Sequence, residues 1–333
     1  MYTVAIILPV YATPENKRLP YFEQAIRSFT RQNLANTNAV IVGIVVDDGS
    51  EEDVESAVKQ CKDSRIRYSR RERKPDDLAT LSNAMNFGIE LCLNKSKDVF
   101  TSEEADEIAA LTYLCSDDLL RNGSIEKRLG KLSRDTSFVY SDFAMFSDKN
   151  GMEYIKKMDF EPDVSKILRK CRAFNFPHPT SMWEINFLQK IKEFVGRKYG
   201  QQGVFDSTIT QREDIDSSLS TFETAFQLGF GISYVPAVSY FTRMDTGGIS
   251  SNGTEAEKIY YEHLVQEKHG TADEQLKTAK IMGNLKDDLP WSLGIYLPEK
   301  IKPTLRPIKQ FIKPILFRLQ HKELVTELSD LLN

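Results

Sequence analysis

The sequence predicts an α/β fold with a mostly parallel central sheet flanked by helices. Three apolar runs, at 3–10, 39–46 and 110–115, have the composition of strands that are buried on both faces of a parallel sheet, and the first two are rich in β-branched residues. Stretches between them carry apolar residues at the spacing of one helical face. Because strands that alternate with helices form parallel sheets, ligands are expected beyond the carboxyl ends of the strands.

The first half of the chain follows this alternation element by element. The expected elements are strand 3–10, helix 22–29, strand 39–46, helix 54–61, strand 66–69, helix 81–92 and strand 110–115. Ser50 and Asp53 approximate a capping box before the second helix. The polar and acidic residues 94–108 are interpreted as an insertion before the strand at 110–115.

The second half shows a weaker pattern, from which fewer elements are expected. They are a strand at 138–142, a loop from 174 that enters a strand near 183, a helix after Asp214, and two strands at 232–235 and 238–241.

Composition excludes several classes of protein. Hydrophobic residues make up 41% of the 333 residues and charged residues 28%, which argues against extended disorder. The chain has a net charge of −4, so it lacks the general excess of basic residues that is typical of a nucleic-acid-binding protein. Four widely spaced cysteines indicate neither a zinc site nor a disulfide framework. Because no basic leader and no run of 18 apolar residues is found, we expect a cytoplasmic protein.

The most informative feature is the carboxylate pair Asp117–Asp118, which follows the strand at 110–115. Two adjacent carboxylates repel each other and lose hydration when they are packed at a strand end. A divalent cation relieves both costs, and Mg²⁺ commonly combines one or two carboxylates with substrate phosphates. The pair therefore predicts an Mn²⁺ or Mg²⁺ site that carries a phosphate ester, although such pairs also occur in solvated turns.

A second carboxylate pair, Asp47–Asp48, follows the strand at 39–46 and begins the sequence Asp-Asp-Gly-Ser. One interpretation is a turn that leads into a helix cap. The other is a nucleoside contact, because a carboxylate at a strand end accepts hydrogen bonds from a base or a ribose. A dinucleotide fold is disfavoured, since Pro9 and Tyr11 occupy the turn that would need glycines.

Five motifs occur along the chain at Ile7–Tyr11, Val46–Ser50, Asn83–Ile89, Tyr113–Asp118 and Arg212–Asp214. In order and spacing they resemble those of the family 2 glycosyltransferases with the GT-A fold. The resemblance covers roughly residues 3–245. It implies a GT-A domain over 1–250, with a nucleotide half at 1–120 and an acceptor half at 121–250, followed by a helical extension over 251–333.

The resemblance also implies an activity and a set of site residues. The activity is metal-assisted transfer of a sugar, with inversion, from a nucleotide-sugar that is usually a UDP-sugar to a hydroxyl of a saccharide or lipid-linked saccharide, in polysaccharide or glycoconjugate synthesis. The implied roles are donor contacts by Pro9, Tyr11, Asp47, Asp48, Asn86 and Asp117, metal ligation by Asp118 and Asp245, general-base catalysis by Asp214, and acceptor contacts by His178, Trp183 and Glu213.

The chain departs from the family pattern at two positions. Cys115 stands where many members have the first Asp of an Asp-x-Asp motif, and Met85 stands where an arginine commonly precedes the asparagine matched by Asn86. A phosphate or nucleoside contact is therefore expected from the arginines at 70, 71 and 73. Asp216 is the nearest competitor of Asp214, but a two-residue offset directs it to the other side of a helix, so its loss is expected to be nearly silent.

Two other functional classes remain open. A sugar nucleotidyltransferase would need a glycine-rich loop after the first strand, and this chain has none there. A non-catalytic nucleotide-sugar-binding or scaffold protein could keep the Asp pairs, and Cys115 favours it. The presence of Asp214 favours an enzyme.

The segment 300–322 differs in composition from the rest. It has seven Lys or Arg residues, no acidic residue, and a stripe of apolar side chains at helical spacing that Pro314 would kink. One interpretation is a helix on an anionic membrane surface, which would make the protein peripheral on the inner face. The other is a helix that packs on the catalytic domain or on a partner subunit.

Overall fold

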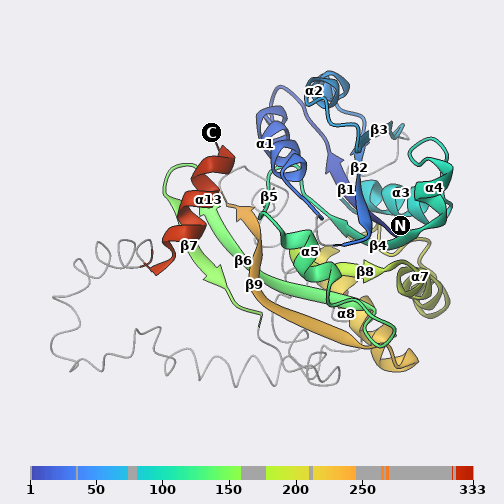
Figure 1. The fold of residues 1–333 in the computed structure, drawn as a ribbon. Helices are drawn as coiled ribbons and strands as arrows, with labels where there is room; N and C mark the ends of the chain where they lie inside the picture. The colour runs from blue at the N-terminus through green and yellow to red at the C-terminus, as the bar shows by residue number, and fades with distance from the viewer. Residues whose placement is uncertain are drawn as a thin grey trace, which may run out of the picture.

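The structure is a computed structural model that describes residues 2–34, 37–73, 81–158, 178–209, 213–244, 264–265, 268–269, 317 and 320–332. Nine strands of the described chain form one sheet (Figure 1). They are β1 Tyr2–Val10, β2 Ala39–Asp47, β3 Ile66–Arg70, β4 Ile108–Tyr113, β5 Leu119–Leu120, β6 Phe138–Ser147, β7 Gly151–Lys156, β8 Met182–Glu184 and β9 Ile232–Arg243.

Helices cover both faces of this sheet. Those described are α1 Leu19–Thr30, α2 Val54–Gln60, α3 Leu81–Leu93, α4 Ser102–Asp106, α5 Ser124–Leu129, α7 Ile185–Tyr199, α8 Glu213–Leu228 and α13 Lys322–Leu332, with a 3₁₀ turn at His178–Thr180. The α/β fold with flanking helices and a C-terminal helix is therefore confirmed.

The sheet is parallel in its first half and mixed in its second. The strand order is β3-β2-β1-β4-β8-β6-β9-β5. Strand β7 lies off this order and pairs with the C-terminal part of β6, whereas β8 pairs with the N-terminal part. Strands β3, β2, β1 and β4 are mutually parallel. The short β8 runs antiparallel to both β4 and β6, and β9 is again parallel to β6. The carboxyl ends of β1, β2, β4, β6 and β9 consequently share one edge, while the expected parallel character is limited to part of the sheet.

Two glycines allow helices to pack closely on opposite faces of the first four strands. A Cβ on Gly43 of β2 would lie 2.9 Å from the ring of Phe29 on α1, and a Cβ on Gly88 of α3 would lie 2.8 Å from Ile7 on β1. Since Gly43 pairs with Ile6, and Ile7 is the next residue, the two contacts are on opposite sides of the sheet. Helices α1 and α3 thus sandwich β1 and β2.

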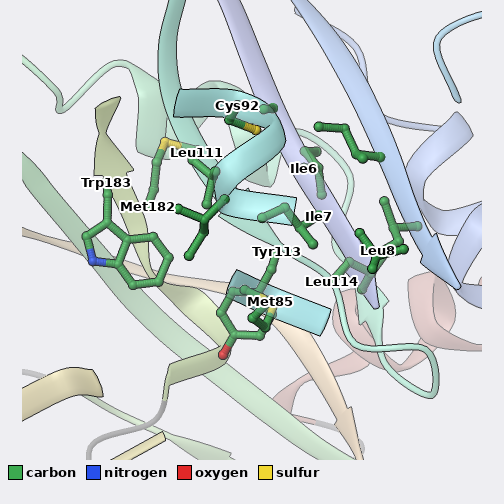
Figure 2. Close-up of a cluster of buried hydrophobic side chains, with 14 of the residues drawn as sticks. Ile6, Ile7, Leu8, Met85, Cys92, Leu111, Tyr113, Leu114, Met182 and Trp183 are labelled. Atoms are coloured by element: carbon green, nitrogen blue, oxygen red, sulfur yellow. The ribbon is translucent and has the colours of Figure 1, made fainter. Parts of the chain in front are cut away.

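The main core lies between these layers and follows the predicted apolar runs. Figure 2 shows its centre, where Ile7 and Leu111 from the sheet meet Met85 of α3 and where Trp183 closes one side. All these side chains are almost completely buried. A second cluster lies under α13, where Leu328 and Leu331 pack on apolar residues of β5, β6, β7 and β9.

Several elements differ from the sequence-based expectations. The strands expected at 232–235 and 238–241 are one strand, β9. Pro236 has no amide N–H to donate, and the pairing with β6 shifts in register at this point, so Pro236 stands outside the regular ladder. The insertion at 94–108 contains α4, which has a true capping box between Thr101 and Glu104. The capping box expected from Ser50 is wrong, because α2 is capped by the Asp53 side chain on the amide of Ser56.

Within the described residues, no helix combines the length and the apolar character needed to cross a bilayer. The proposed boundary at 250 remains a prediction, although α13, from the predicted extension, packs against the sheet of the first domain (Figure 1).

Candidate active site

The ends of β1 and β2 bring the first predicted site residues together. Val10 and Asp47 are register partners, and the amide of Asp48 donates to the carbonyl of Val10 at 2.8 Å. Pro9 is buried on β1, and Tyr11 follows it with a partly exposed ring. Tyr11, Asp47 and Asp48 are therefore neighbours at the carboxyl edge of the sheet, as the order of the elements predicted.

The two carboxylates of the first pair have different environments. The fully buried Asp47 accepts hydrogen bonds from the amide of Ser50 at 2.8 Å, the hydroxyl of Tyr68 at 2.6 Å and the guanidinium of Arg70 at 2.8 Å. These three donors occupy it within the protein. Gly49 completes the turn with φ of 76°, a conformation that glycine adopts without strain. Asp47 thus stabilises the turn, which is the first of its two interpretations.

Asp48 instead connects two arginines and an aromatic ring. It accepts from Arg71 at 3.0 Å and from Arg73 at 3.0 and 3.3 Å. The guanidinium carbon of Arg73 lies 3.7 Å from the centroid of the Tyr11 ring, in the range of a cation–π contact. The arginines that the sequence nominated therefore lie beside the predicted nucleoside contacts.

The second pair follows β4 in the loop that leads to β5. The side chain of Asp117 retains 17% exposure and forms an ion pair with Arg18, the residue that precedes α1. Asp118 is 6% exposed, and its Oδ1 accepts from the amide of Arg243 at 2.8 Å. Asp117 is therefore the more accessible of the two, whereas the sequence-based prediction assigned the metal to Asp118 and the nucleotide to Asp117.

Burial, followed by the negative charge of Asp117, raises the pKa of Asp118 well above its usual value. The amide of Arg243 and the hydroxyl of Tyr240 oppose this shift only in part. Burial and the charge of Asp118 also raise the pKa of Tyr240. The pair thus sits in a region where added positive charge is favourable.

Arg243, at the end of β9, is the residue that connects this region, and the sequence analysis missed it. Its fully buried guanidinium donates to the carbonyl of Asp117 at 2.9 Å, and contacts Asp148 and Gln24. The guanidinium also lies 4.6 Å from the ring centroids of Tyr21 and Phe146. Only the tertiary structure could reveal this, since Arg243 is 125 residues from Asp118 along the chain.

The carboxylates fit a hard divalent cation by their chemistry. Asp117 and Asp118 supply oxygen ligands, and their mutual repulsion would be relieved by Mn²⁺ or Mg²⁺. No group of three or more potential ligands among His, Cys, Asp and Glu occurs in the described part of the chain. The described protein thus offers one or two carboxylates, which suits a cation that also binds phosphate oxygens. Asp245, the other predicted ligand, lies outside the described residues.

Asn86 anchors the loop that contains Phe205. Its side chain donates to the carbonyl of Phe205 at 2.7 Å and accepts from the amide of Phe205 at 2.9 Å. These two bonds fasten the loop before α8 to α3 and leave one N–H and one lone pair of the carboxamide for other partners. Its predicted contact with the nucleotide remains a prediction beside this role as a loop anchor.

Asp214 lies in the first turn of α8, as expected, and is partly exposed. Its Oδ1 accepts from the amide of Ile215 at 2.9 Å. Burial lowers the pKa of Lys156, and the charge of Asp214 offsets part of that shift, which shows that the two groups are within electrostatic range. The side chains of Glu213 and His178 lie outside the described part of the structure, so their predicted acceptor contacts remain predictions.

Trp183 is not an acceptor contact in this structure. The indole is 1% exposed, packs with Tyr113 and Phe138, and donates from Nε1 to the hydroxyl of Thr221 at 3.3 Å. Figure 2 shows it at the margin of the core beside Met182. The prediction is corrected because an indole on β8, between β4 and β6, is covered by α8.

Comparison with known proteins points to one family. The model of the family "Glycosyl transferase family 2" matches residues 5–191. A curated protein of Rickettsia bellii (strain RML369-C), described as an uncharacterized glycosyltransferase, is 29% identical over 173 residues. The match covers 50% of this chain and 21% of that protein, so the chain spans about a fifth of the relative's length.

Solved structures show more distant similarity. Residues 1–349 of S. aureus TarS, in complex with UDP, align with a TM-score of 0.49 at 14% identity, over 91% of this chain and 78% of that one. The mannosyltransferase PcManGT from Pyrobaculum calidifontis, in complex with GDP-Man and Mn²⁺, aligns with a TM-score of 0.46 at 12% identity, over 98% and 85%.

Proposed function

The chain belongs to glycosyltransferase family 2, and from this premise we propose that it transfers a sugar from a UDP-sugar to a hydroxyl of a saccharide or lipid-linked saccharide, with inversion. One observation supports this most. The carboxylates after β2 and β4 occupy the same edge of the sheet. Arginine side chains from two separate segments pair with them, and the backbone amide of Arg243 from a third segment donates to Asp118. Such an edge matches a ligand that carries both a nucleoside and phosphates.

In the proposed donor site, Tyr11 and Arg73 form a flat platform that suits a base. Arg71 and Arg73 are held by Asp48 at 3.0 Å each, which fixes their planar guanidinium groups before a ligand arrives. Arginine forks bind phosphate and ribose oxygens with defined geometry. The role of Asp48 is then to position these arginines and to accept a hydrogen bond from the nucleoside.

Asp117 and Asp118 would hold the Mn²⁺ or Mg²⁺ ion of the diphosphate. When bound, such a cation stabilises the charge that develops on the leaving group. To bind the cation, Asp117, the more accessible carboxylate, would exchange its ion pair with Arg18 for the metal. Asp118 would contribute a second carboxylate from its buried position. Arg243 keeps the pair in place through its contacts to the backbone of Asp117 and the side chain of Asp118.

Asp214 is the proposed general base that takes the proton from the acceptor hydroxyl. Its place in the first turn of α8 leaves it partly exposed, so an acceptor hydroxyl can reach its carboxylate, and Lys156 lies within electrostatic range. His178 and Glu213 are proposed to contact the acceptor. The family resemblance places Glu213 beside Asp214, and it matches the region of His178 to the floor of the acceptor site.

The proposal is tested by incubating the protein with UDP-sugars, Mn²⁺ and water, and by measuring released UDP. Slow metal-dependent hydrolysis is expected in the wild type. Asp214→Asn keeps the size of the side chain but removes the base, so turnover with an acceptor should fall at least about a hundredfold while donor affinity is retained. UDP-sugar binding with no turnover in the wild type would identify a non-catalytic nucleotide-sugar-binding protein instead.

The basic segment 300–322 lies almost entirely outside the described residues, and we keep the membrane surface as a proposal for it. The helix that follows, α13, packs on the catalytic domain and leaves the segment attached to it. The test is sedimentation with anionic vesicles at low salt, compared with neutral vesicles. Equal sedimentation with both vesicles, or none with either, would assign the segment to protein packing.

A further inference from the structure

A buried network of charged side chains joins residues 268 and 269 to α8. His269 is fully buried in its side chain and lies between two carboxylates, with Nε2 2.9 Å from Asp216 Oδ1 and Nδ1 3.2 Å from Glu223 Oε1. The ammonium of Lys268 contacts Asp216 Oδ1 at 2.8 Å and Asp206 Oδ2 at 2.8 Å. A sixth residue, Lys198 of α7, pairs with Glu223 at 2.9 Å.

The network is balanced in charge, and its members come from four parts of the chain. Three carboxylates face three cations when His269 is protonated. Helices α7 and α8 pack together at this place (Figure 1). Removal of one partner would leave a buried charge without compensation, so the network strongly favours one arrangement of these segments.

The first turn of α8 needs such external support. It begins Glu-Asp-Ile-Asp-Ser-Ser, and Ser and Asp have low helix propensity because their side chains compete for backbone hydrogen bonds. The hydroxyls of Ser217 and Ser218 indeed donate to the carbonyl of Asp214 at 3.2 and 2.6 Å. Because the first amide groups of a helix lack partners within it, this turn would fray if nothing else held it.

A continuous set of contacts holds this turn to the rest of the domain. Asn86 of α3 binds the backbone of Phe205 through two hydrogen bonds, and Asp206 follows directly. Lys268 then joins Asp206 to Asp216, two residues after the proposed base. The nucleotide half of the sheet is thereby connected to α8 through side chains that all have defined partners.

We propose that Asp216, Lys268 and His269 are positioning residues for Asp214, through a buried ion network that fixes the first turn of α8. This deepens the proposed function and rests on it, since it takes Asp214 as the base. It also corrects the expectation that loss of Asp216 would be nearly silent: Asp216 does lie on the other side of the helix from Asp214, but there it is fully buried between Lys268 and His269.

The test compares two substitutions at Lys268 in the full chain. Lys268→Met keeps most of the length of the side chain but loses the charge, and kcat should fall about tenfold or more while the affinity for UDP-sugar stays within about twofold, because small misplacement of a catalytic group is costly. Lys268→Arg keeps a cation that can reach both carboxylates and should restore kcat to within about threefold. Asp216→Asn should resemble Lys268→Met.

A matched control separates positioning from general stability. Asp63→Asn weakens the part-buried ion pair between Asp63 and Arg65, which lies just before β3. Strand β3 is at one end of the strand order, far along the sheet from β8, which packs against α8 through Trp183. Asp63→Asn should lower the melting temperature without changing kcat. The positioning role is overturned if Lys268→Met and Asp216→Asn keep wild-type kcat. It is also overturned if Asp63→Asn loses as much kcat per degree of lost melting temperature as those two variants do. Full turnover by Asp214→Asn would instead overturn the proposed base.

Discussion

Adjacent carboxylates in this protein differ in environment because successive residues at a strand end point in different directions. Asp47 points inward to Tyr68 and Arg70, whereas Asp48 points to Arg71 and Arg73. Asp117, which pairs with Arg18, and its more deeply buried neighbour Asp118 differ in the same way. One member of each pair thus accepts hydrogen bonds from backbone amides, and the other pairs with arginine side chains.

Removal of Arg18 should strengthen metal binding by the free protein. In the donor-free state the guanidinium competes with a cation for Asp117, and a part-exposed ion pair of this kind is worth up to about 1 kcal/mol. Arg18→Ala should therefore raise the affinity for Mn²⁺ about two- to fivefold, as measured by calorimetry without nucleotide. Arg31→Ala, which removes an exposed charge just after the same helix, is the control and should change nothing. Unchanged affinity in Arg18→Ala would show that the arginine does not compete.

At the residue scale, the sequence indicates the motifs but not the partners. Local hydrophobic patterns predict well where strands and helices end. The Asp pairs and Asp214 could therefore be placed at such ends from the sequence. Arg18, Tyr240 and Arg243 could not be found, since neither a residue before a helix nor a residue in a strand carries a local signal that its side chain will face a distant carboxylate. Trp183 was misassigned for the same reason: aromatic residues suit both an acceptor site and a core.

At the element scale, helices and strands with a strong hydrophobic periodicity were predicted well. Elements that bury polar side chains or contain a proline were predicted less well. Helices α1, α2 and α3 lie where apolar residues repeat at helical spacing, and β1 and β2 where continuous apolar runs occur. Strand β9 was divided in two because Pro236 is unusual inside a strand, yet shifts in register accommodate it. Helix α8 has many buried Ser and Thr side chains, so its full length was not evident from hydrophobic pattern.

Helix α13 should contribute to the stability of the catalytic domain. Leu328 is 2% exposed and packs on the second apolar cluster, so Leu328→Ala leaves a cavity that costs about 2–5 kcal/mol. Urea unfolding is the measurement. Leu332→Ala, at a partly exposed position on the same helix, should cost clearly less. Equal costs for the two substitutions would mean that α13 does not pack as described.

At the scale of the whole molecule, the buried ion network should give stability a defined dependence on pH. Burial would raise the pKa of Glu223, but hydrogen bonding and charge from His269 lower it to about 2. Burial would lower the pKa of His269, but its bonds to Asp216 and Glu223 raise it. Glu223 then stabilises the fold above its ordinary pKa and loses this effect as the pH falls toward about 2. His269 stabilises it below its ordinary pKa and loses this effect as the pH rises through the raised value.

The two effects are both complete between about pH 4.5 and 6.5, the ordinary values of the two groups. His269→Gln should therefore be most destabilising within this window and less so at alkaline pH, where wild-type His269 has also lost its proton. Denaturant unfolding at several pH values measures the difference, with Lys198 and Tyr199 unchanged as the remaining partners of Glu223. A difference that grows above pH 8 would contradict the assigned direction.

The whole fold also predicts how the donor and the metal act together. Asp118 carries a raised pKa because it is buried beside Asp117, so its ionisation destabilises the free protein at neutral pH. Asp118→Asn should raise the melting temperature of the free protein, since an amide can still accept the hydrogen bond from Arg243. A bound cation compensates the same charge, so UDP and Mn²⁺ together should stabilise the wild type more than the sum of their separate effects.

With both ligands near a hundred times their Kd, the stabilisation from one bound complex is about 2.7 kcal/mol, which corresponds to a rise of roughly 4–5 °C in Tm for a protein of this size. In Asp118→Asn the rise should disappear for the combination while any effect of UDP alone remains, because the nucleoside contacts around Tyr11 and Arg73 are unchanged. Thermal shift with Mn²⁺ alone, UDP alone and both separates these effects. Equal shifts in the variant and the wild type would place the metal elsewhere and leave Asp118 as a buried structural carboxyl.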